Sequence, residues 1–225
     1  MTKQFDEIAH VYDETLPEHV ARHYLEKRTR FLSRLGGGRA ILDVCSGTGK
    51  LSEALLAQGR AVYSLDLSRN MLLVRKAVPH YRPVNGSALA LPFKDAVFDM
   101  TLSVAAMHHI ATPERVASAI IEMQRVTRRG GAIVIWDHNP GNPYWHILMK
   151  KVPQDTGEER LIPAEELKAL FPADSYECRI WKLGFMPDFV PKQMLGIFRV
   201  IESLVERLPL LRLLAAHNVL VARKY

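Results

Sequence analysis

The residues with the clearest chemical potential form a glycine-containing turn and an acid on the apolar segment that follows. The apolar run 41–44 leads directly into Cys45-Ser46-Gly47-Thr48-Gly49 and then into a helical pattern. Gly47 and Gly49 let the backbone approach a ligand where a Cβ would clash, and the following helix offers unpaired N–H groups. Asp66 ends the next apolar run, where its carboxylate can accept two hydrogen bonds from a ribose diol. This pair predicts a ribose-bearing cofactor, and its spacing suits NAD as well as other adenosyl cofactors.

Both features also have a purely structural interpretation. Glycine pairs between a strand and a helix form tight turns in many folds, and an acid at a strand end often caps the next helix. Ser68 offers a cap at the same place. The ribose role is therefore the favoured interpretation for Asp66.

The elements around this turn alternate between short apolar runs and helical patterns. Such alternation indicates βαβ units and a parallel sheet, whose ligands bind at the carboxyl ends of the strands. The predicted strands cover 40–44, 61–65, 81–84, 97–103 and 132–136, and the predicted helices cover 50–58, 68–77 and 113–128. Gly130-Gly131 is expected to break the regular structure between the last helix and the last strand of this series.

The two ends of the chain are predicted to add mainly helices to this core. Residues 5–35 have helical spacing and end at a glycine triplet, which stops a helix. Residues 138–162 contain three prolines and are predicted to form a loop with one helical turn. Beyond them we expect helices at 163–171 and 192–208 and extended segments at 176–184 and 217–223. One apolar stripe of the 192–208 helix comprises Met194, Ile197, Phe198, Ile201, Leu204, Val205 and Leu208.

Length and composition indicate one globular catalytic domain. The 225 residues are 48% hydrophobic and 24% charged, which is ordinary for a domain that buries a single core. We therefore treat 1–225 as one domain. It is divided into a helical lead-in at 1–38, a cofactor-binding core at 39–137, and an acceptor-side loop with cap helices and last strands at 138–225.

Charge, cysteines and hydropathy limit the classes of partner. The net charge of +6 is spread along the chain. Its densest basic run, 125–129, lies at the end of a predicted helix, where cations complement the helix dipole, and a phosphate-binding patch is the alternative. Cys45 and Cys178 match no disulfide or metal spacing, so we expect no metal and a reducing compartment. No signal core or apolar run of membrane-spanning length is present. These features favour a cytoplasmic protein with no nucleic-acid partner and no membrane span, and they leave the oligomeric state open.

Several further motifs follow one another along the chain. They lie at 5–13, 42–49, 66–68 with Met71, 85–93, 98–99, Ser103, 107–109, 122–126 and 130–131. As a series they resemble class I S-adenosylmethionine-dependent methyltransferases, especially the type-11 group with ubiquinone and menaquinone methyltransferase-like members. The resemblance implies a Rossmann-like three-layer α/β sandwich with a mostly parallel seven-stranded sheet, a helical N-terminal lead-in and a helical cap inserted near the C-terminus. The implied cofactor is S-adenosyl-L-methionine.

The resemblance also assigns cofactor contacts to residues of this chain. The backbone around Asp43, Cys45, Gly47 and Gly49 would hold the methionine part, and Asp66 would bind the ribose. The remaining assigned positions surround the adenine or lie nearby: Leu67, Met71, Ser87, Ala88, Leu89 and Ser103. Among these, Leu67 and Met71 would enclose the ring, and the Ser87 side chain and Ala88 N–H would bind its edge.

Two positions depart from the family pattern. Cys45 stands where the group usually has its first glycine, and Ser87 stands where it usually has an acid. We expect Cys45 to keep a negative φ, because a Cβ is poorly tolerated in the left-handed region. Ser87 is expected to hydrogen-bond the adenine amino group without charge.

Candidate acceptor-side residues follow the fourth and fifth predicted strands. His108 and His109 come after the fourth strand and could supply a general base, and Asp137 and His138 follow the fifth. An acceptor wall could comprise Tyr12, Tyr24, Asn139, Tyr144 and Trp145. The alternatives are hydrogen-bonded structural histidines, a turn whose Asn and Asp satisfy their own backbone, and tyrosines that serve packing.

The sequence thus predicts methyl transfer to a small organic acceptor, held in line behind the sulfonium methyl group. The apolar stripe at 192–208 and the loop at 138–162 are expected to cover that acceptor. An RNA or protein methyltransferase is the second hypothesis, encouraged by the net charge but lacking a concentrated basic stripe. A cofactor-binding protein without methylation activity is the third, because of Cys45 and Ser87.

Overall fold

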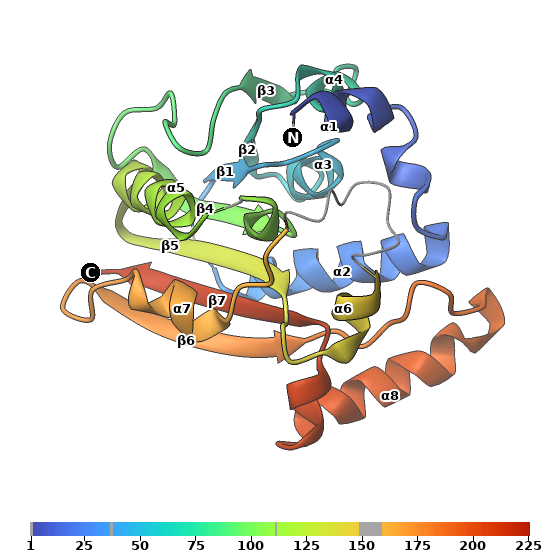
Figure 1. Ribbon diagram of the computed structural model, residues 1–225. Coiled ribbons are helices and arrows are strands. Elements are labelled where there is room, and N and C mark those ends of the chain that lie inside the picture. Colours follow the sequence, from blue (N-terminus) through green and yellow to red (C-terminus); the bar gives the residue numbers. More distant parts are fainter. Residues whose placement is uncertain (1, 37, 111, 149–158) are drawn as a thin grey trace.

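The computed structural model describes residues 2–36, 38–110, 112–148 and 159–225 and is organised around one sheet. The strands follow the order β3-β2-β1-β4-β5-β7-β6 (Figure 1). Pairing is parallel from β3 to β5, whereas β7 is antiparallel to both β5 and β6. The strands are β1 (Ala40–Val44), β2 (Ala61–Asp66), β3 (Arg82–Asn85), β4 (Phe98–Val104), β5 (Thr127–His138), β6 (Tyr176–Leu183) and β7 (His217–Lys224). The expectation of a mostly parallel seven-stranded sheet is confirmed.

Helices cover both faces of this sheet because successive strand residues point to opposite sides. Leu42, Val44 and Ile135 face one side, where α5 (Pro113–Val126) and α7 (Ala164–Ala169) pack. Ile41, Val134 and Trp136 face the other side, against α2 (Glu18–Arg34) and α3 (Lys50–Leu56). The result is the three-layer α/β sandwich expected from the sequence.

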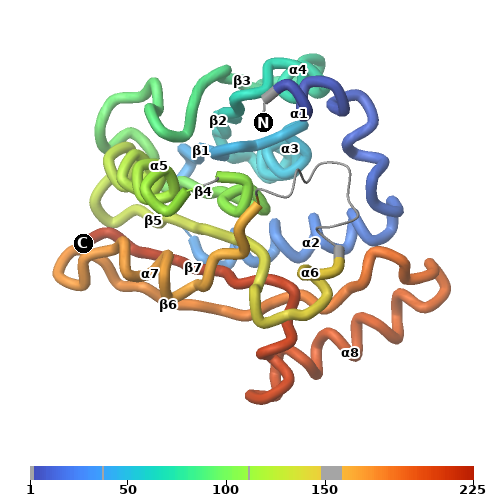
Figure 2. Tube along the Cα trace, viewed as in Figure 1, coloured from blue at the N-terminus to red at the C-terminus, as the bar shows by residue number. Residues whose placement is uncertain are grey.

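Local signals set where the shorter helices begin. The Ser68 hydroxyl accepts a hydrogen bond from the Met71 N–H at the start of α4 (Arg69–Leu73), which is shorter than the predicted helix. Thr112 caps α5, where proline occupies the first turn. The lead-in forms α1 (Thr2–Ile8) and the short η1 (Tyr12–Glu14) before α2, and α1 lies against α4 (Figure 2). Among the described helices, none combines the length and apolar character that crossing a bilayer requires.

Gly130-Gly131 does not form a turn between the helix and the next strand, so that prediction is wrong. α5 ends at Val126 and β5 begins directly at Thr127, with Gly130 at φ 75° inside the strand. A Cβ on Gly131 would lie 2.8 Å from the Arg128 carbonyl oxygen and 2.9 Å from the Asp99 carbonyl oxygen. Glycine is therefore required there by close backbone approach, beside an irregularity in the β4–β5 register.

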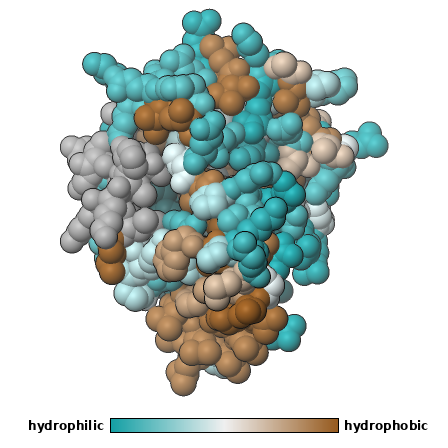
Figure 3. Space-filling view, turned by 90° about the vertical axis from the view of Figure 1, so that its right-hand side faces the viewer, coloured by the Kyte–Doolittle hydropathy of each residue, from teal (hydrophilic) through white to brown (hydrophobic). Residues whose placement is uncertain are grey.

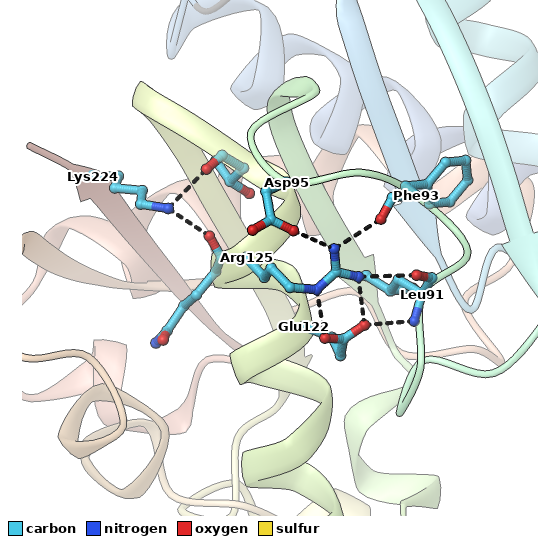
Figure 4. Close-up of polar contacts among 8 residues, drawn as sticks. Leu91, Phe93, Asp95, Glu122, Arg125 and Lys224 are labelled. Carbon is cyan, nitrogen blue, oxygen red and sulfur yellow. Dashed lines mark hydrogen bonds and ion pairs between the residues drawn. The ribbon is translucent and has the colours of Figure 1, made fainter.

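Two arginines of the basic run at 125–129, Arg125 and Arg128, have partners within the protein. Arg125 pairs with Glu122 and Asp95 and donates to the carbonyl oxygens of Leu91 and Phe93 (Figure 4). In the same view, Lys224 donates to the carbonyl oxygens of Gln124 and Thr127. Arg128 lies on β5, not at a helix end, and pairs with Asp99. Only Arg125 keeps its predicted place in the last turn of α5.

The C-terminal third carries the expected cap helix between β6 and β7. This insertion contains η3 (Lys192–Met194), α8 (Leu195–Arg207) and η4 (Leu211–Leu214). The predicted stripe does not act as one buried cover, because Met194, Ile197, Leu204 and Leu208 are exposed. Within the predicted loop, β5 continues to His138 and α6 (Pro143–Leu148) supplies the helical turn. Residues 149–158 of that loop lie outside the described residues.

Candidate active site

The glycine turn and Asp66 meet at the carboxyl edge because β1 and β2 are parallel neighbours. The Gly47 N–H donates to Asp66 Oδ2 at 2.8 Å, and the Ser68 N–H donates to Oδ1 at 2.8 Å. Backbone N–H groups thus hold both carboxylate oxygens, and a carboxylate has about four acceptor sites, so a further donor can still be accepted. Burial raises the pKa of Asp66. The predicted juxtaposition of turn and acid is confirmed, and the carboxylate is held in place.

Cys45 adopts φ 58°, so the expectation of a negative φ is wrong. Gly47 and Gly49 also have positive φ, which means that left-handed residues recur through the turn. A non-glycine residue in this region stores strain, and such residues cluster at ligand sites. A Cβ on Gly49 would lie 2.6 Å from the Tyr81 hydroxyl, whereas the space beside Gly47 is open. Burial raises the pKa of the Cys45 thiol, so this cysteine remains protonated.

Asp43 lies beneath the turn as a buried carboxylate. The Ser52 hydroxyl donates to its Oδ2 at 2.7 Å, and the Ser64 hydroxyl donates to Ser52 at 2.7 Å. Burial raises the pKa of Asp43 to about 7. Its side chain therefore links β1 to α3 and, through Ser52, to β2.

The N-terminal lead-in forms hydrogen bonds and an ion pair with residues in and around the turn at 45–49. The Thr48 hydroxyl donates to Asp13 Oδ1 at 2.7 Å, and Arg75 donates to Asp13 Oδ2 at the same distance. Ser68 donates to Asp6 Oδ1 at 2.5 Å. The segment with α1 and η1 thus covers the turn through carboxylates that bind both sides of it.

On the predicted adenine side, the structure separates residues that the sequence grouped. Leu67 is 52% exposed, whereas Met71 is 1% exposed and part of the packing of α4. Met71 therefore offers no surface to a ring, because its position on the helix turns it into the core. The Ser87 hydroxyl accepts from the Leu89 N–H at 3.1 Å and keeps its own proton to donate, and Ala88 is buried next to it.

Two buried hydroxyl groups near the strand ends have no hydrogen-bond partner among the described residues. They belong to Ser46 in the turn after β1 and to Ser103 near the end of β4. Buried polar atoms are otherwise nearly always satisfied in folded proteins. Unused donors at this edge are what a polar cofactor would satisfy.

A cluster of histidines surrounds Asp137 at the end of β5. His108 Nδ1 lies 2.6 Å from Asp137 Oδ1, and the His108 backbone N–H donates to Oδ2 at 3.1 Å. The His138 N–H also donates to Oδ1, at 2.7 Å. The His138 ring stacks on Trp145 with centroids 3.7 Å apart, and it lies 4.2 Å from the His108 ring. The predicted catalytic residues are therefore brought together around one carboxylate.

Burial and mutual repulsion keep most of this cluster uncharged. Burial lowers the pKa of His109 to about 4, with His108 contributing, and it lowers the pKa of His138 as well. Burial alone would raise the pKa of Asp137, but His108 and His138 hold it well below its usual range. The cluster therefore contains one buried carboxylate beside two rings, His109 and His138, that stay neutral.

His108, Asp137 and His138 also place possible metal-ligand atoms within 4.8 Å of one another. The sequence predicts no such group, because its members come from two separate segments. The hydrogen bond between His108 Nδ1 and Asp137 occupies two of the three groups. A hydrogen-bonded dyad accounts for these short distances, and we assign no ion to them.

Two of the five residues of the predicted acceptor wall, Asn139 and Tyr24, use their polar groups within the fold. Asn139 is buried, and its amide donates to the carbonyl oxygens of Leu213 and Ala215 while its Oδ1 accepts from the Gly141 N–H. These bonds use its polar atoms, so Asn139 offers none to an acceptor. The Tyr24 hydroxyl donates to the Met186 carbonyl oxygen at 2.6 Å, and its ring packs against His217.

Of the other predicted wall residues, Trp145 lies directly against the histidine cluster. Trp145 donates from Nε1 to the Ala216 carbonyl oxygen and presents its ring to His138. Tyr144 donates to Asp188 at 3.2 Å. Phe5 packs edge-on against both Tyr12 and His109, with centroids 6.3 Å and 5.2 Å apart. The lead-in thus reaches from the cofactor turn to the histidine cluster.

Arg28 is a candidate site residue that sequence reasoning missed. Its guanidinium lies over the rings of Tyr24 and Trp136, 5.6 Å and 6.0 Å from their centroids. Burial lowers its pKa, while the nearby carboxylates of Asp43 and Asp137 raise it. The sequence did contain a signal for Arg28. It lies four residues after Tyr24, on the inner stripe of α2, and a charge on the buried side of a helix often has a function.

The comparisons with known proteins agree with this geometry. A family model described as "Methyltransferase domain" matches residues 42–135. Demethylmenaquinone methyltransferase of Renibacterium salmoninarum is 33% identical over 169 residues, covering 68% of this chain and 70% of that protein. The protein of the same name from Paenarthrobacter aurescens is 30% identical over 199 residues, covering 84% and 76%.

Solved structures share the fold over nearly the whole chain. A SAM-dependent methyltransferase from Thermotoga maritima, described as a possible histamine N-methyltransferase, has a TM-score of 0.71 at 16% identity and covers 100% of this chain and 99% of its own. A SAM-dependent methyltransferase from Archaeoglobus fulgidus has a TM-score of 0.66 at 19% identity, with 91% and 94% covered. The fold and the comparisons therefore define a class I, Rossmann-like methyltransferase. The chain belongs to the type-11 group of this family, and its cofactor is S-adenosyl-L-methionine.

Proposed function

We propose that the protein methylates a small hydroxylated aromatic acceptor of the quinol type, with the His108–Asp137 dyad accepting the acceptor's proton. The observation that carries this proposal is the stack of His108, His138 and Trp145 around a buried carboxylate at the carboxyl edge. Flat rings of this kind suit a flat acceptor. The related demethylmenaquinone methyltransferases support a quinol-type acceptor.

The residues at the edge of β1 and β2 fit the adenosyl cofactor. The open space beside Gly47 and the unpartnered hydroxyl groups of Ser46 and Ser103 leave room and donors for a polar ligand. Asp66 would bind the ribose hydroxyls with its remaining lone pairs, and Leu67 would contact the adenine. Arg28 would bind the carboxylate of the methionine part, since an arginine suits carboxylate geometry. When bound, the cofactor supplies an electrophilic methyl group on a positively charged sulfur.

The chain's own contribution to the reaction is positioning and proton acceptance. Asp137 accepts from His108 Nδ1, which places the basic lone pair of that ring on Nε2. Protonation of His108 pairs it with the buried negative charge of Asp137, so the dyad takes up a proton without leaving a net charge behind. Phe5 and the η1 segment cover the edge and exclude water from it.

An RNA acceptor has no specific observation in its favour. Within the densest basic run, Arg125 pairs with Glu122 and Asp95, and Arg128 pairs with Asp99. Phosphate binding depends on several accessible cations, and two of the three arginines of this run have internal partners. We therefore do not extend the RNA hypothesis.

Transfer of a radiolabelled methyl group from S-adenosylmethionine tests the proposed acceptor class. We expect labelling of a short-chain demethylmenaquinol and none of the already methylated menaquinol, which is the matched control. The His108→Gln variant should retain cofactor binding and lose labelling. Histamine labelled in preference to the quinol, or no labelling of any hydroxylated ring, would overturn the acceptor assignment and leave the methyltransferase class intact.

A further inference from the structure

Residues 194–214 present an extensive exposed apolar surface, formed by α8, η4 and the turn between them. Large apolar side chains here have exposed fractions between 40% and 81%: Met194, Ile197, Val200, Leu204, Leu208, Leu210, Leu211, Leu213 and Leu214. Figure 3 shows brown side chains gathered at the lower end of the face that lies to the right in Figure 1, where α8 and η4 project from the sheet. We call these residues the apolar cap surface. Contiguous apolar patches of this kind on a folded domain mark interaction sites.

The orientation of α8 is fixed by its acids, which point into the protein. Glu202 accepts from the Phe185 N–H at 2.8 Å, and it lies 2.8 Å from His23 Nε2 and 2.9 Å from Lys27 Nζ. Glu206 pairs with the same lysine and accepts from the Gly184 N–H. Burial alone would raise the pKa of Glu202, but its partners lower it to about 2. The helix therefore cannot rotate its apolar face inward without breaking these bonds.

This arrangement inverts the usual pattern of a surface helix. A surface helix normally buries its apolar stripe and exposes its charges. On α8, Val205 and Glu202 are buried, whereas Ile197, Val200 and Leu204 are exposed at helical spacing. Leu195 and Phe198 complete the inner side against Val20 and Tyr24 of α2. The core beneath α8 is thus already filled, and the outer apolar stripe serves no described packing.

The charges around the apolar cap surface are basic. Lys192, Arg199, Arg207 and Arg212 are exposed, and the acids of the same stretch, Glu202 and Glu206, are consumed by Lys27, His23 and backbone donors. Arg199 also lies 3.5 Å from Glu26 of α2. An exposed apolar stripe edged by arginine and lysine is the pattern of a helix that lies in the interface of an anionic bilayer.

We propose that the apolar cap surface docks on the surface of a bilayer containing anionic phospholipids. The helix lies parallel to the membrane, with its apolar side chains among the acyl chains and its basic residues at the headgroups. A second copy of this chain is a poorer occupant, because a two-fold contact would bring the same basic residues against each other. This inference goes beyond the proposed function, and its test measures no methyl transfer.

Co-sedimentation with vesicles tests the docking. We expect the full chain to bind vesicles of phosphatidylcholine and phosphatidylglycerol, to bind pure phosphatidylcholine more weakly, and to be released as salt is raised. The Ile197→Gln/Val200→Gln/Leu204→Gln variant should bind the anionic vesicles about tenfold more weakly or worse, since it loses three apolar contacts. The matched control is Ile121→Gln, which changes a 59% exposed isoleucine on α5. That control should bind like the unchanged protein.

Further measurements keep the result interpretable. Thermal melting and S-adenosylhomocysteine binding of the triple variant should equal those of the unchanged protein, which shows that its fold and cofactor site are intact. Absence of vesicle binding by the unchanged protein would overturn the proposal, as would equal binding by the triple variant. A dimer in sedimentation that the triple variant dissociates, with no vesicle binding, would assign the surface to a second copy instead. None of these outcomes depends on the acceptor, so failure here is distinguishable from failure of the proposed function.

Discussion

The two halves of the active site are built in different ways. Around Asp66, the contacts use backbone groups close in sequence, with Ser68 two residues away and Gly47 nineteen residues away. Around the acceptor edge, side chains meet across long separations, as in His108 with Asp137 at 29 residues and Tyr24 with Met186 at 162. The contacts of Asp66 therefore follow from local motifs, whereas the side-chain contacts of the acceptor half form only when distant segments of the chain come together.

The two halves also differ in charge state. The cofactor half holds carboxylates whose pKa values are raised by burial, Asp43 and Asp66. The acceptor half holds two histidines whose pKa values are lowered by burial, His109 and His138, beside a carboxylate whose pKa is lowered by its histidine partners. If this contrast is functional, changes in one half should affect cofactor affinity, and changes in the other should affect turnover.

The largest expected effect is on turnover in the acceptor half. His108→Gln removes the proposed proton acceptor and should lower kcat about 100-fold, because general-base catalysis contributes about 10²–10⁴-fold. The dissociation constant for S-adenosylhomocysteine, measured by calorimetry, should stay unchanged. His10→Gln, which changes an exposed histidine, serves as the control. A parallel loss of cofactor affinity in His108→Gln would show that the residue supports the fold rather than the reaction.

The next effect is on the ribose contact of the cofactor half. Asp66→Ala should weaken binding of S-adenosylhomocysteine at least tenfold, about 1.4 kcal/mol, through loss of charge-assisted hydrogen bonds. Binding of 5′-methylthioadenosine should weaken equally, since it carries the same ribose. Asp95→Ala, a change of an acid whose side chain is 76% exposed, should leave both affinities unaltered. An unchanged dissociation constant for Asp66→Ala would remove this acid from the site.

Arg28 lies near a carboxylate of each half, Asp43 and Asp137. Its proposed role distinguishes a ligand that has the methionine part from one that lacks it. Arg28→Met should weaken S-adenosylhomocysteine binding about fivefold, about 1 kcal/mol, because a charge-assisted contact to the methionine carboxylate is lost. Binding of 5′-methylthioadenosine, which lacks that carboxylate, should not change. Arg30→Met alters an exposed arginine of the same helix and is the control. Equal weakening of both ligands would place Arg28 in general packing instead.

The next effect is on stability instead of on binding or turnover. The pKa of Asp43 is about 7 in the folded protein against 3.8 in the unfolded chain, so its contribution to stability is lost as pH rises from about 4 through 7. Asp43→Asn should therefore raise the melting temperature at pH 8 by several degrees, at about 2–4 °C per kcal/mol, and change it little at pH 4. Thermal melts at both values measure this difference. A gain of the same size at both pH values would exclude ionisation of Asp43 as the cause.

His109 and His217 should give the free energy of unfolding the opposite dependence on pH. Burial holds their pKa values at about 4 and about 3, below the ordinary 6.5, so the stability that they contribute is present above pH 6.5 and is lost as pH falls. Asp43→Asn should leave this acid limb in place. The two halves would then be distinguished by the direction of their pH dependence.

The sequence was most informative where chemistry and local structure coincide. The turn at 45–49, the acid at 66 and the alternating strands and helices rest on short-range patterns. Its errors lie where tertiary contacts overrode a local preference. Gly130-Gly131 looks like a helix break but permits close approach of β4 and β5, and Cys45 accepts a left-handed conformation because the surrounding turn enforces it.

The sequence by itself determined the class of fold, and its resemblance to a methyltransferase family indicated the cofactor. The fold class depends on glycine conformation and on the alternation of strands and helices, both of which are local. Only the tertiary structure decided that His108 pairs with Asp137, that Arg28 reaches the site from the lead-in, and that α8 turns its acids inward and its apolar stripe outward. A helical stripe does not specify which of its faces meets the core, because that choice depends on partners contributed by distant segments of the chain.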